Sequence, residues 1–129
     1  MRQVVHTNNA PKAIGPYSQA IIFNGLIFVS GQVPVNPKTG EVVTSSFADE
    51  VKQVMSNVNA ILTEAGTNIN NAVKITIFLS DMNNFTELNE LYASYFTSDQ
   101  YPARECVQVA RLPRDVNVEI SVIAQVESK

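Results

Sequence analysis

The sequence has a single cysteine, Cys106, and a single histidine, His6. One cysteine excludes a framework of disulfide bonds within the chain, and one histidine argues against a histidine-rich metal centre. Basic residues are also few, since 9 Lys and Arg stand against 12 Asp and Glu, for a net charge of −3. Proteins that bind nucleic acid through general electrostatics are usually basic. We therefore expect no nucleic-acid partner, although a local basic patch stays open.

Long apolar runs are absent as well. The longest are residues 20–23 and 26–29, four residues each, whereas a membrane-spanning helix needs about 20. Residues 1–9 contain only one apolar pair after the initial Met, and a secretory signal requires an apolar run of about 7 or more. These absences lead us to expect a soluble cytoplasmic protein without a membrane partner.

The composition is that of a globular domain. Of the 129 residues, 45% are hydrophobic and 16% are charged, which is too apolar for a disordered chain. The length suits one domain that spans residues 1–129 and buries a substantial core.

Local patterns predict most of the elements. Asn24-Gly25 separates the two apolar runs and predicts a hairpin with a type I′ turn, because both residues tolerate positive φ. Ser46 can cap a helix whose apolar residues recur at helical spacing until Gly66 stops it. A second helix is expected after Asp81 or Asn83. Further strands are expected near residues 3–5, 73–79, 104–111 and 117–126.

The resulting order, β-β-β-α-β-α-β-β, predicts a two-layer α+β domain in which two helices cover only one face of a sheet. The aromatic stripe of the second helix, over residues 85–96, is interpreted as core. In the last two strands, Arg104 and Cys106 alternate with Val107, and Glu119 alternates with Ile120. If the valine sides meet the helices, Arg104, Cys106 and Glu119 all emerge on the uncovered face. Such a mixed surface favours an oligomer interface with a ligand pocket between subunits.

Four blocks of sequence, in order, resemble the Rid family (RidA/YjgF). A lone Pro-Ala-Arg would be weak, but together the blocks extend over nearly the whole chain. They are APKAIGPYSQA (10–20), SGQ (30–32), NELY (89–92) and YPARECVQVARLP with the following VEI (101–113 and 118–120).

The resemblance implies a chorismate-mutase-like α+β fold, with a mixed sheet and both helices on one face. It also implies a homotrimer whose sheets form a central β-barrel, with a cleft at each subunit interface. The implied activity is hydrolysis of 2-imino acids such as 2-iminobutanoate and 2-iminopropanoate, or their enamine tautomers, to 2-keto acids and ammonia. That reaction protects pyridoxal-phosphate enzymes, and it requires no metal or organic cofactor.

The chemistry suits the residue types. Arg104 is the candidate clamp for the substrate carboxylate, because a guanidinium matches a carboxylate with two parallel hydrogen bonds. Glu119 is the candidate general base that holds and polarises the attacking water. The resemblance implies a backbone contact with the imine nitrogen at Cys106, whose thiol we interpret as pocket lining. It places four further residues around the pocket: Tyr17, Ser30, Gly31 and Asn89.

Other interpretations stay open at this point. One alternative is that Arg104 and Glu119 form a structural ion pair at an interface. Another is that the same pocket senses a keto acid and acts through a protein partner. Some Rid proteins are described as ribonucleases or translation inhibitors, and a chaperone-like role after oxidation has been proposed in the family.

Overall fold

The computed structural model describes residues 1–126. The helices are α1 (Phe47–Glu64) and α2 (Phe85–Ala93), with short 3₁₀ helices at Ile69–Asn71, Met82–Asn84 and Pro113–Asp115. The strands are β1 (Gln3–Val5), β2 (Ala20–Phe23), β3 (Leu26–Gln32), β4 (Ala72–Leu79), β5 (Ala103–Gln108) and β6 (Val118–Gln125). The predicted order of elements is confirmed.

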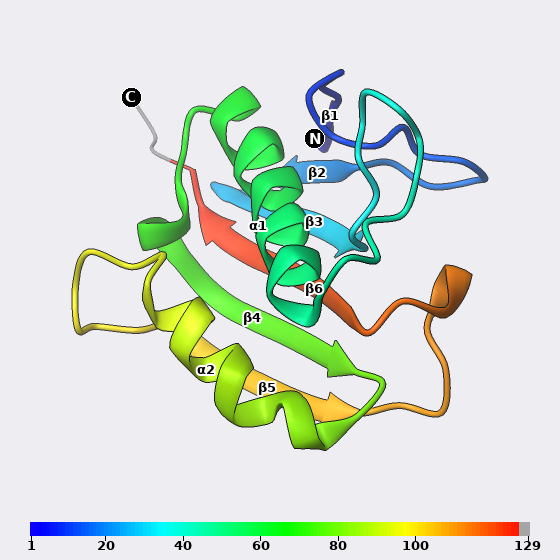
Figure 1. Cartoon of the computed structure of the whole chain (residues 1–129). Helices are drawn as coiled ribbons and strands as arrows, with labels where there is room; N and C mark the ends of the chain where they lie inside the picture. The colour runs from blue at the N-terminus through cyan, green and yellow to red at the C-terminus, as the bar shows by residue number, and fades with distance from the viewer. Residues whose placement is uncertain (127–129) are drawn as a thin grey trace.

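The six strands form one mixed sheet in the order β1-β2-β3-β6-β4-β5. Strands β4 and β5 are parallel, and the other neighbouring strands are antiparallel. Both α-helices lie on the same side of the sheet (Figure 1), with α1 over β3 and β6 and α2 over β4 and β5. The core fills the space between the layers. The predicted α+β fold with two helices on one face is therefore confirmed. Within residues 1–126, no helix is long and apolar enough to cross a membrane.

Local chemistry explains the ends of α1. The Ser46 hydroxyl oxygen accepts a hydrogen bond from the Asp49 backbone N–H at 3.0 Å, so the predicted cap is confirmed. Gly66 follows the helix with φ of +79°, a conformation that favours glycine. Helix α2 ends sooner than expected, and its stripe continues past Ala93 into the following turn. There Tyr95 and Phe96 still pack against the core.

The β2–β3 hairpin turns at Asn24 and Gly25, whose φ angles are 51° and 77°. These positive values confirm the predicted type of turn. The register between β3 and β6 shifts between Val29 and Gln32, which places an irregularity at Ser30 and Gly31. Irregularities of this kind re-aim side chains, and two of the predicted pocket residues lie at this one.

The start of β6 is held by a buried carboxylate of α1. Glu50 is only 3% exposed and accepts hydrogen bonds from the backbone N–H of Asn117 at 2.9 Å and from its side-chain amide at 2.6 Å. Two such donors satisfy the carboxylate in a site that water does not reach. This contact anchors the chain two residues before Glu119.

The prediction for the two sides of β5 was wrong. Arg104 pairs with Ile75 and Cys106 with Ile77 in the parallel ladder, and both isoleucines are buried under the helices. Paired residues share a face of the sheet, so Arg104 and Cys106 lie on the helix-covered side. Val107, which is 45% exposed, lies on the uncovered side instead.

The physical reason is the position of β5 at the edge of the sheet. Only the short helix α2 covers it, so an arginine remains partly exposed on the helix-covered side. Glu119 pairs with Phe78 and lies on the uncovered face, as predicted. That face carries apolar and polar groups together, including the ion pair between Lys74 Nζ and Glu105 Oε1 at 3.0 Å. Its apolar members include Ile21, Phe23, Phe28, Phe78, Val107 and Ile123.

Candidate active site

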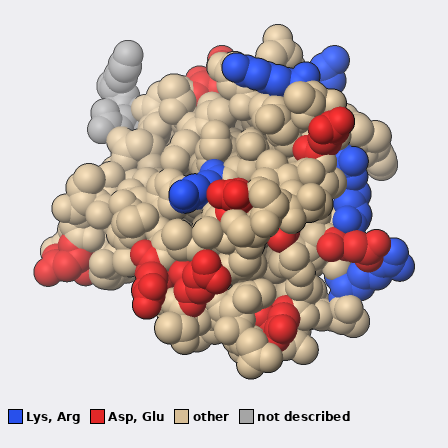
Figure 2. All heavy atoms as spheres, in the orientation of Figure 1, with Lys and Arg blue, Asp and Glu red and all other residues tan. Residues whose placement is uncertain are grey.

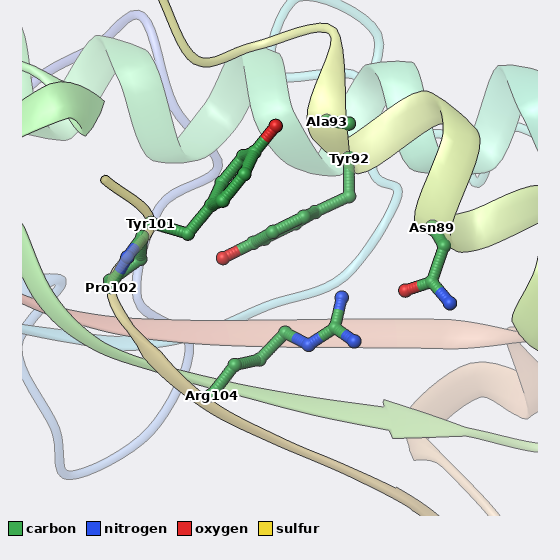
Figure 3. A pocket seen from close by; sticks show the side chains of 6 residues that line it. All are labelled: Asn89, Tyr92, Ala93, Tyr101, Pro102 and Arg104. Atoms are coloured by element: carbon green, nitrogen blue, oxygen red, sulfur yellow. The ribbon is translucent and has the colours of Figure 1, made fainter. Parts of the chain in front are cut away.

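A cavity of about 500 Å³ opens between α2 and β5. Asn89 comes from α2 and Arg104 from β5, and both side chains point into the same space (Figure 3). The volume is in the range of small-molecule sites. Two of the predicted site residues therefore meet in one cavity. The complete lining is Asn89, Tyr92, Ala93, Tyr101, Pro102 and Arg104.

The guanidinium of Arg104 is held by aromatic rings. Its central carbon lies 4.9 Å from the ring centroid of Tyr92 and 5.6 Å from that of Phe85. Within residues 1–126, no carboxylate pairs with this guanidinium and no protein group accepts a hydrogen bond from it. Its N–H donors are thus free to bind a planar anion such as a carboxylate.

Cys106 lies one step further along the helix-covered side of β5 and packs against the core. Burial raises the pKa of its thiol, and the charge of Arg104 opposes that rise. A raised pKa keeps the sulfur protonated at neutral pH, so it is a poor nucleophile. This environment fits a residue that lines a pocket rather than one that attacks a substrate.

A second group of predicted residues includes Glu119 and Gly31, which meet on the uncovered face, and Ser30 and Tyr17, which lie near Gly31 along β3 and the loop before β2. The Glu119 carboxylate lies against the Cα of Gly31, where a Cβ would overlap its Oε2 and come within 2.8 Å of its Cδ. Burial raises the pKa of Glu119. The Ser30 hydroxyl donates to the Ser18 carbonyl at 2.6 Å, which links β3 to the loop that carries Tyr17. The exposed Tyr17 hydroxyl accepts from the Ile14 backbone N–H at 3.4 Å.

The two groups do not meet within one chain. Arg104 and Glu119 lie on opposite faces of the sheet, and β4 lies between their strands. Since neighbouring strands are about 4.8 Å apart, β5 and β6 are separated by about 10 Å. A structural ion pair between Arg104 and Glu119 inside one subunit is therefore excluded. One small ligand cannot contact both side chains of the same chain.

Part of the cavity was not predicted from the sequence. Tyr92 was interpreted as core, and it is buried with 5% exposure, yet it also lines the cavity. Its position three residues after Asn89 on a helix was a usable signal, because such residues share a face. Tyr101 and Pro102 also line the cavity, and their place just before Arg104 in the chain was a second signal. Within residues 1–126, no cluster of three or more His, Cys, Asp or Glu side chains is placed to hold a metal ion.

Replacing Gly31 with alanine is expected to lower catalytic activity at least about tenfold with little loss of stability. The added methyl must displace the Glu119 carboxylate, and displacing the predicted general base should lower the rate steeply. Because the displaced atoms are the end of a flexible side chain, the fold should tolerate the change. Thermal unfolding and turnover of Gly31→Ala, measured beside the wild-type protein, check this. Normal turnover in Gly31→Ala would show that the Glu119 position does not matter.

Known proteins resemble this chain in sequence over nearly its whole length. The sequence profile of a family described as Endoribonuclease L-PSP matches residues 7–126. A 2-iminobutanoate/2-iminopropanoate deaminase of Escherichia coli K12 is 47% identical over 126 residues, which cover 96% of this chain and 98% of that protein. A RutC family protein of Pyrococcus horikoshii is 50% identical over 127 residues, covering 98% of this chain and all of the other.

Solved structures of similar sequence have the same fold. YyfA from Yersinia pestis, described as a protein of unknown function of the conserved Rid family, has a TM-score of 0.95 at 48% identity and covers 98% of this chain. TdcF of E. coli, crystallised with bound serine, has a TM-score of 0.90 at 44% identity and also covers 98% of this chain. All of the Yersinia chain and 99% of the TdcF chain are matched. With the profile and the curated relatives, these matches confirm the resemblance, and the chain belongs to the Rid (YjgF/Endoribonuclease L-PSP) family.

Proposed function

We propose that this protein is a hydrolytic deaminase that converts small 2-imino acids, such as 2-iminobutanoate and 2-iminopropanoate, to 2-keto acids and ammonia. The observation that carries the proposal is the Arg104 guanidinium, which faces a cavity with uncommitted donors. The name of the 47% identical E. coli relative supports the same reaction. Its physiological role would be to remove reactive imines and enamines before they damage pyridoxal-phosphate enzymes.

The proposed site is shared between two subunits. One chain supplies Asn89, Arg104 and Cys106. The partner subunit supplies the second group, which consists of Glu119, Gly31, Ser30 and Tyr17. This arrangement accounts for two half-sites that lie on opposite faces of one sheet. It also gives a role to the apolar uncovered face and to the free edge of β5, which a second copy can cover. We propose the homotrimer with a central β-barrel as that assembly.

The chemistry balances with water as the only co-reactant. Arg104 binds the carboxylate beside the protonated C=N group. The water oxygen bonds to the imine carbon, the π electrons of the C=N bond move to nitrogen, and Glu119 accepts a proton from the water. Glu119 then gives that proton to the nitrogen. The C–N bond breaks as the C=O bond of the 2-keto acid forms, and the hydroxyl proton passes through Glu119 to the departing ammonia. No electron is gained or lost, so the proposal includes no cofactor.

The charge distribution favours this reaction over cleavage of RNA, which the family description names. The net charge is −3, and on the face in Figure 2 the Lys and Arg side chains are interrupted by acidic ones. A ribonuclease would need a continuous basic path for the phosphate backbone. A small acid needs only one cation at the site.

A coupled assay tests the function directly. An amino-acid oxidase or threonine dehydratase generates the imine, semicarbazide traps what survives, and the purified protein competes with the trap. Less trapped imine with the wild-type protein is the expected result. If no amino acid tested gives a decrease while the protein still binds a 2-keto acid, the proposal is wrong and the site is a ligand sensor.

Mixing two inactive variants tests the shared site. Arg104→Ala and Glu119→Gln should each be inactive alone, but after denaturation and refolding together they should regain activity. With random assembly in a ring, about a quarter of the interfaces combine an intact Arg104 with an intact Glu119 of the partner subunit. Refolding each variant alone is the control. Absence of any recovery in a mixture that refolds and assembles normally would overturn the shared site.

A further inference from the structure

Arg104 is restrained by aromatic side chains rather than by a carboxylate. The rings of Tyr92 and Phe85, both on α2, lie 4.9 Å and 5.6 Å from its guanidinium carbon. Figure 3 shows the Tyr92 ring beside the Arg104 side chain, with the guanidinium directed toward Asn89. Within residues 1–126, no acidic residue shares this contact.

This arrangement has a chemical consequence. A carboxylate partner would occupy the same in-plane N–H donors that a substrate carboxylate needs. A ring attracts the cation through its electron-rich face and leaves those donors uncommitted. The rings also restrict a long side chain that would otherwise sample many rotamers. The cation is thereby held in place while its capacity for hydrogen bonding stays available.

The Tyr92 hydroxyl separates the role of the ring from that of the polar group. It is buried and has no hydrogen-bond partner within residues 1–126. Burial raises the pKa of this phenol, so it stays neutral and adds no charge beside Arg104. A buried hydroxyl without a partner does not stabilise the fold. Tyr92→Phe therefore removes a group that the fold does not need and keeps the ring.

We propose that Tyr92, assisted by Phe85, is a positioning residue for Arg104 and stands in place of an ion-pair partner so that the guanidinium can bind the substrate carboxylate. The inference rests on the proposed function and adds the aromatic contact that leaves the N–H donors of Arg104 free for the substrate. It predicts that the ring of Tyr92 matters for binding of a carboxylate, and that its hydroxyl does not.

The test uses the full-length protein and two matched probes, 2-oxobutanoate and its uncharged amide, with binding measured by calorimetry beside imine turnover. Tyr92→Phe should bind 2-oxobutanoate within about threefold of wild type, and Tyr92→Leu should bind it about tenfold more weakly. Binding of the amide should be the same in all three proteins. In turnover, Tyr92→Leu should raise KM more than it lowers kcat.

A double-mutant cycle with Arg104→Ala separates positioning from general packing. In the Arg104→Ala background, Tyr92→Leu should have no further effect on binding of 2-oxobutanoate, because there is no guanidinium left to position. An equal loss in both backgrounds overturns the proposal, as does equal damage from Tyr92→Phe and Tyr92→Leu. If Tyr92→Leu does not fold, Phe85→Leu takes its place in the same cycle, with a smaller expected loss because this ring is farther away.

The two proposals fail in different ways. Absence of imine turnover in the wild-type protein overturns the proposed deaminase activity. The double-mutant cycle, measured by binding of 2-oxobutanoate, still decides the role of Tyr92. Unchanged binding of 2-oxobutanoate by Arg104→Ala overturns both.

Discussion

Replacing Arg104 with alanine is expected to lower kcat/KM for the proposed imine hydrolysis by about 100-fold or more, with the proposed trimer still assembled. Loss of a paired, hydrogen-bonded charge in a binding site costs about 2–5 kcal/mol, and each 1.4 kcal/mol is about tenfold. The loss should appear in KM and in kcat together, since in the proposed mechanism the same contact anchors the carboxylate and orients the C=N carbon. The coupled assay measures it.

The folding of this variant should be close to normal. Arg104 makes no ion pair within residues 1–126, so its removal breaks no charge network. Arg104→Lys is the matched variant, because it keeps the charge but not the planar fork. We expect it to recover only a small part of the activity. Wild-type turnover in Arg104→Ala would rule out the carboxylate clamp.

Replacing Glu119 with glutamine should remove the base and keep the shape. General acid–base catalysis contributes about 10²- to 10⁴-fold, and we expect a loss of kcat in that range. Binding of 2-oxobutanoate should be unchanged, because in the proposed site Arg104 rather than Glu119 holds the carboxylate. Single-turnover kinetics and calorimetry on the same preparation check both statements. Turnover at the wild-type rate would remove Glu119 from the mechanism.

The pH dependence follows from burial, which raises the pKa of Glu119. The proposed base acts in its deprotonated form, so wild-type kcat/KM should fall as the pH drops through a value above the ordinary glutamate pKa of about 4.3. Glu119→Gln, at its much lower rate, should lack this acidic limb. A limb that persists unchanged in Glu119→Gln would assign it to another group.

The same shift affects stability with a definite sign. A carboxyl group whose pKa is raised in the folded state stabilises the fold in its neutral form, and this contribution disappears as the pH rises through the raised pKa. At neutral pH the buried charge of Glu119 therefore costs stability. Glu119→Gln should have the higher Tm at pH 7, and the difference should vanish below about pH 4, where the unfolded carboxyl is also protonated. Thermal unfolding at the two pH values measures this.

Local sequence determined most of the elements. The Asn24-Gly25 turn, the Ser46 cap and the apolar spacing of α1 each depend on residues close together in the chain, and all three were predicted correctly. The order of elements then predicted two layers with one uncovered face. The motif blocks predicted the family correctly. They also named the candidate site residues, because short motifs carry chemistry that does not depend on knowing the fold, and the roles of these residues stay predictions.

The tertiary structure alone decided how those residues are arranged. Strand alternation divides β5 into two sides, but it does not say which side faces the helices, since an edge strand under a short helix tolerates Arg104 and Cys106 inward and Val107 outward. The approach of Glu119 to Gly31 and of Tyr92 to Arg104 joins residues from separate elements. Such contacts depend on the register of the strands and the packing of α2, which involve the whole chain at once and leave no local pattern in the sequence.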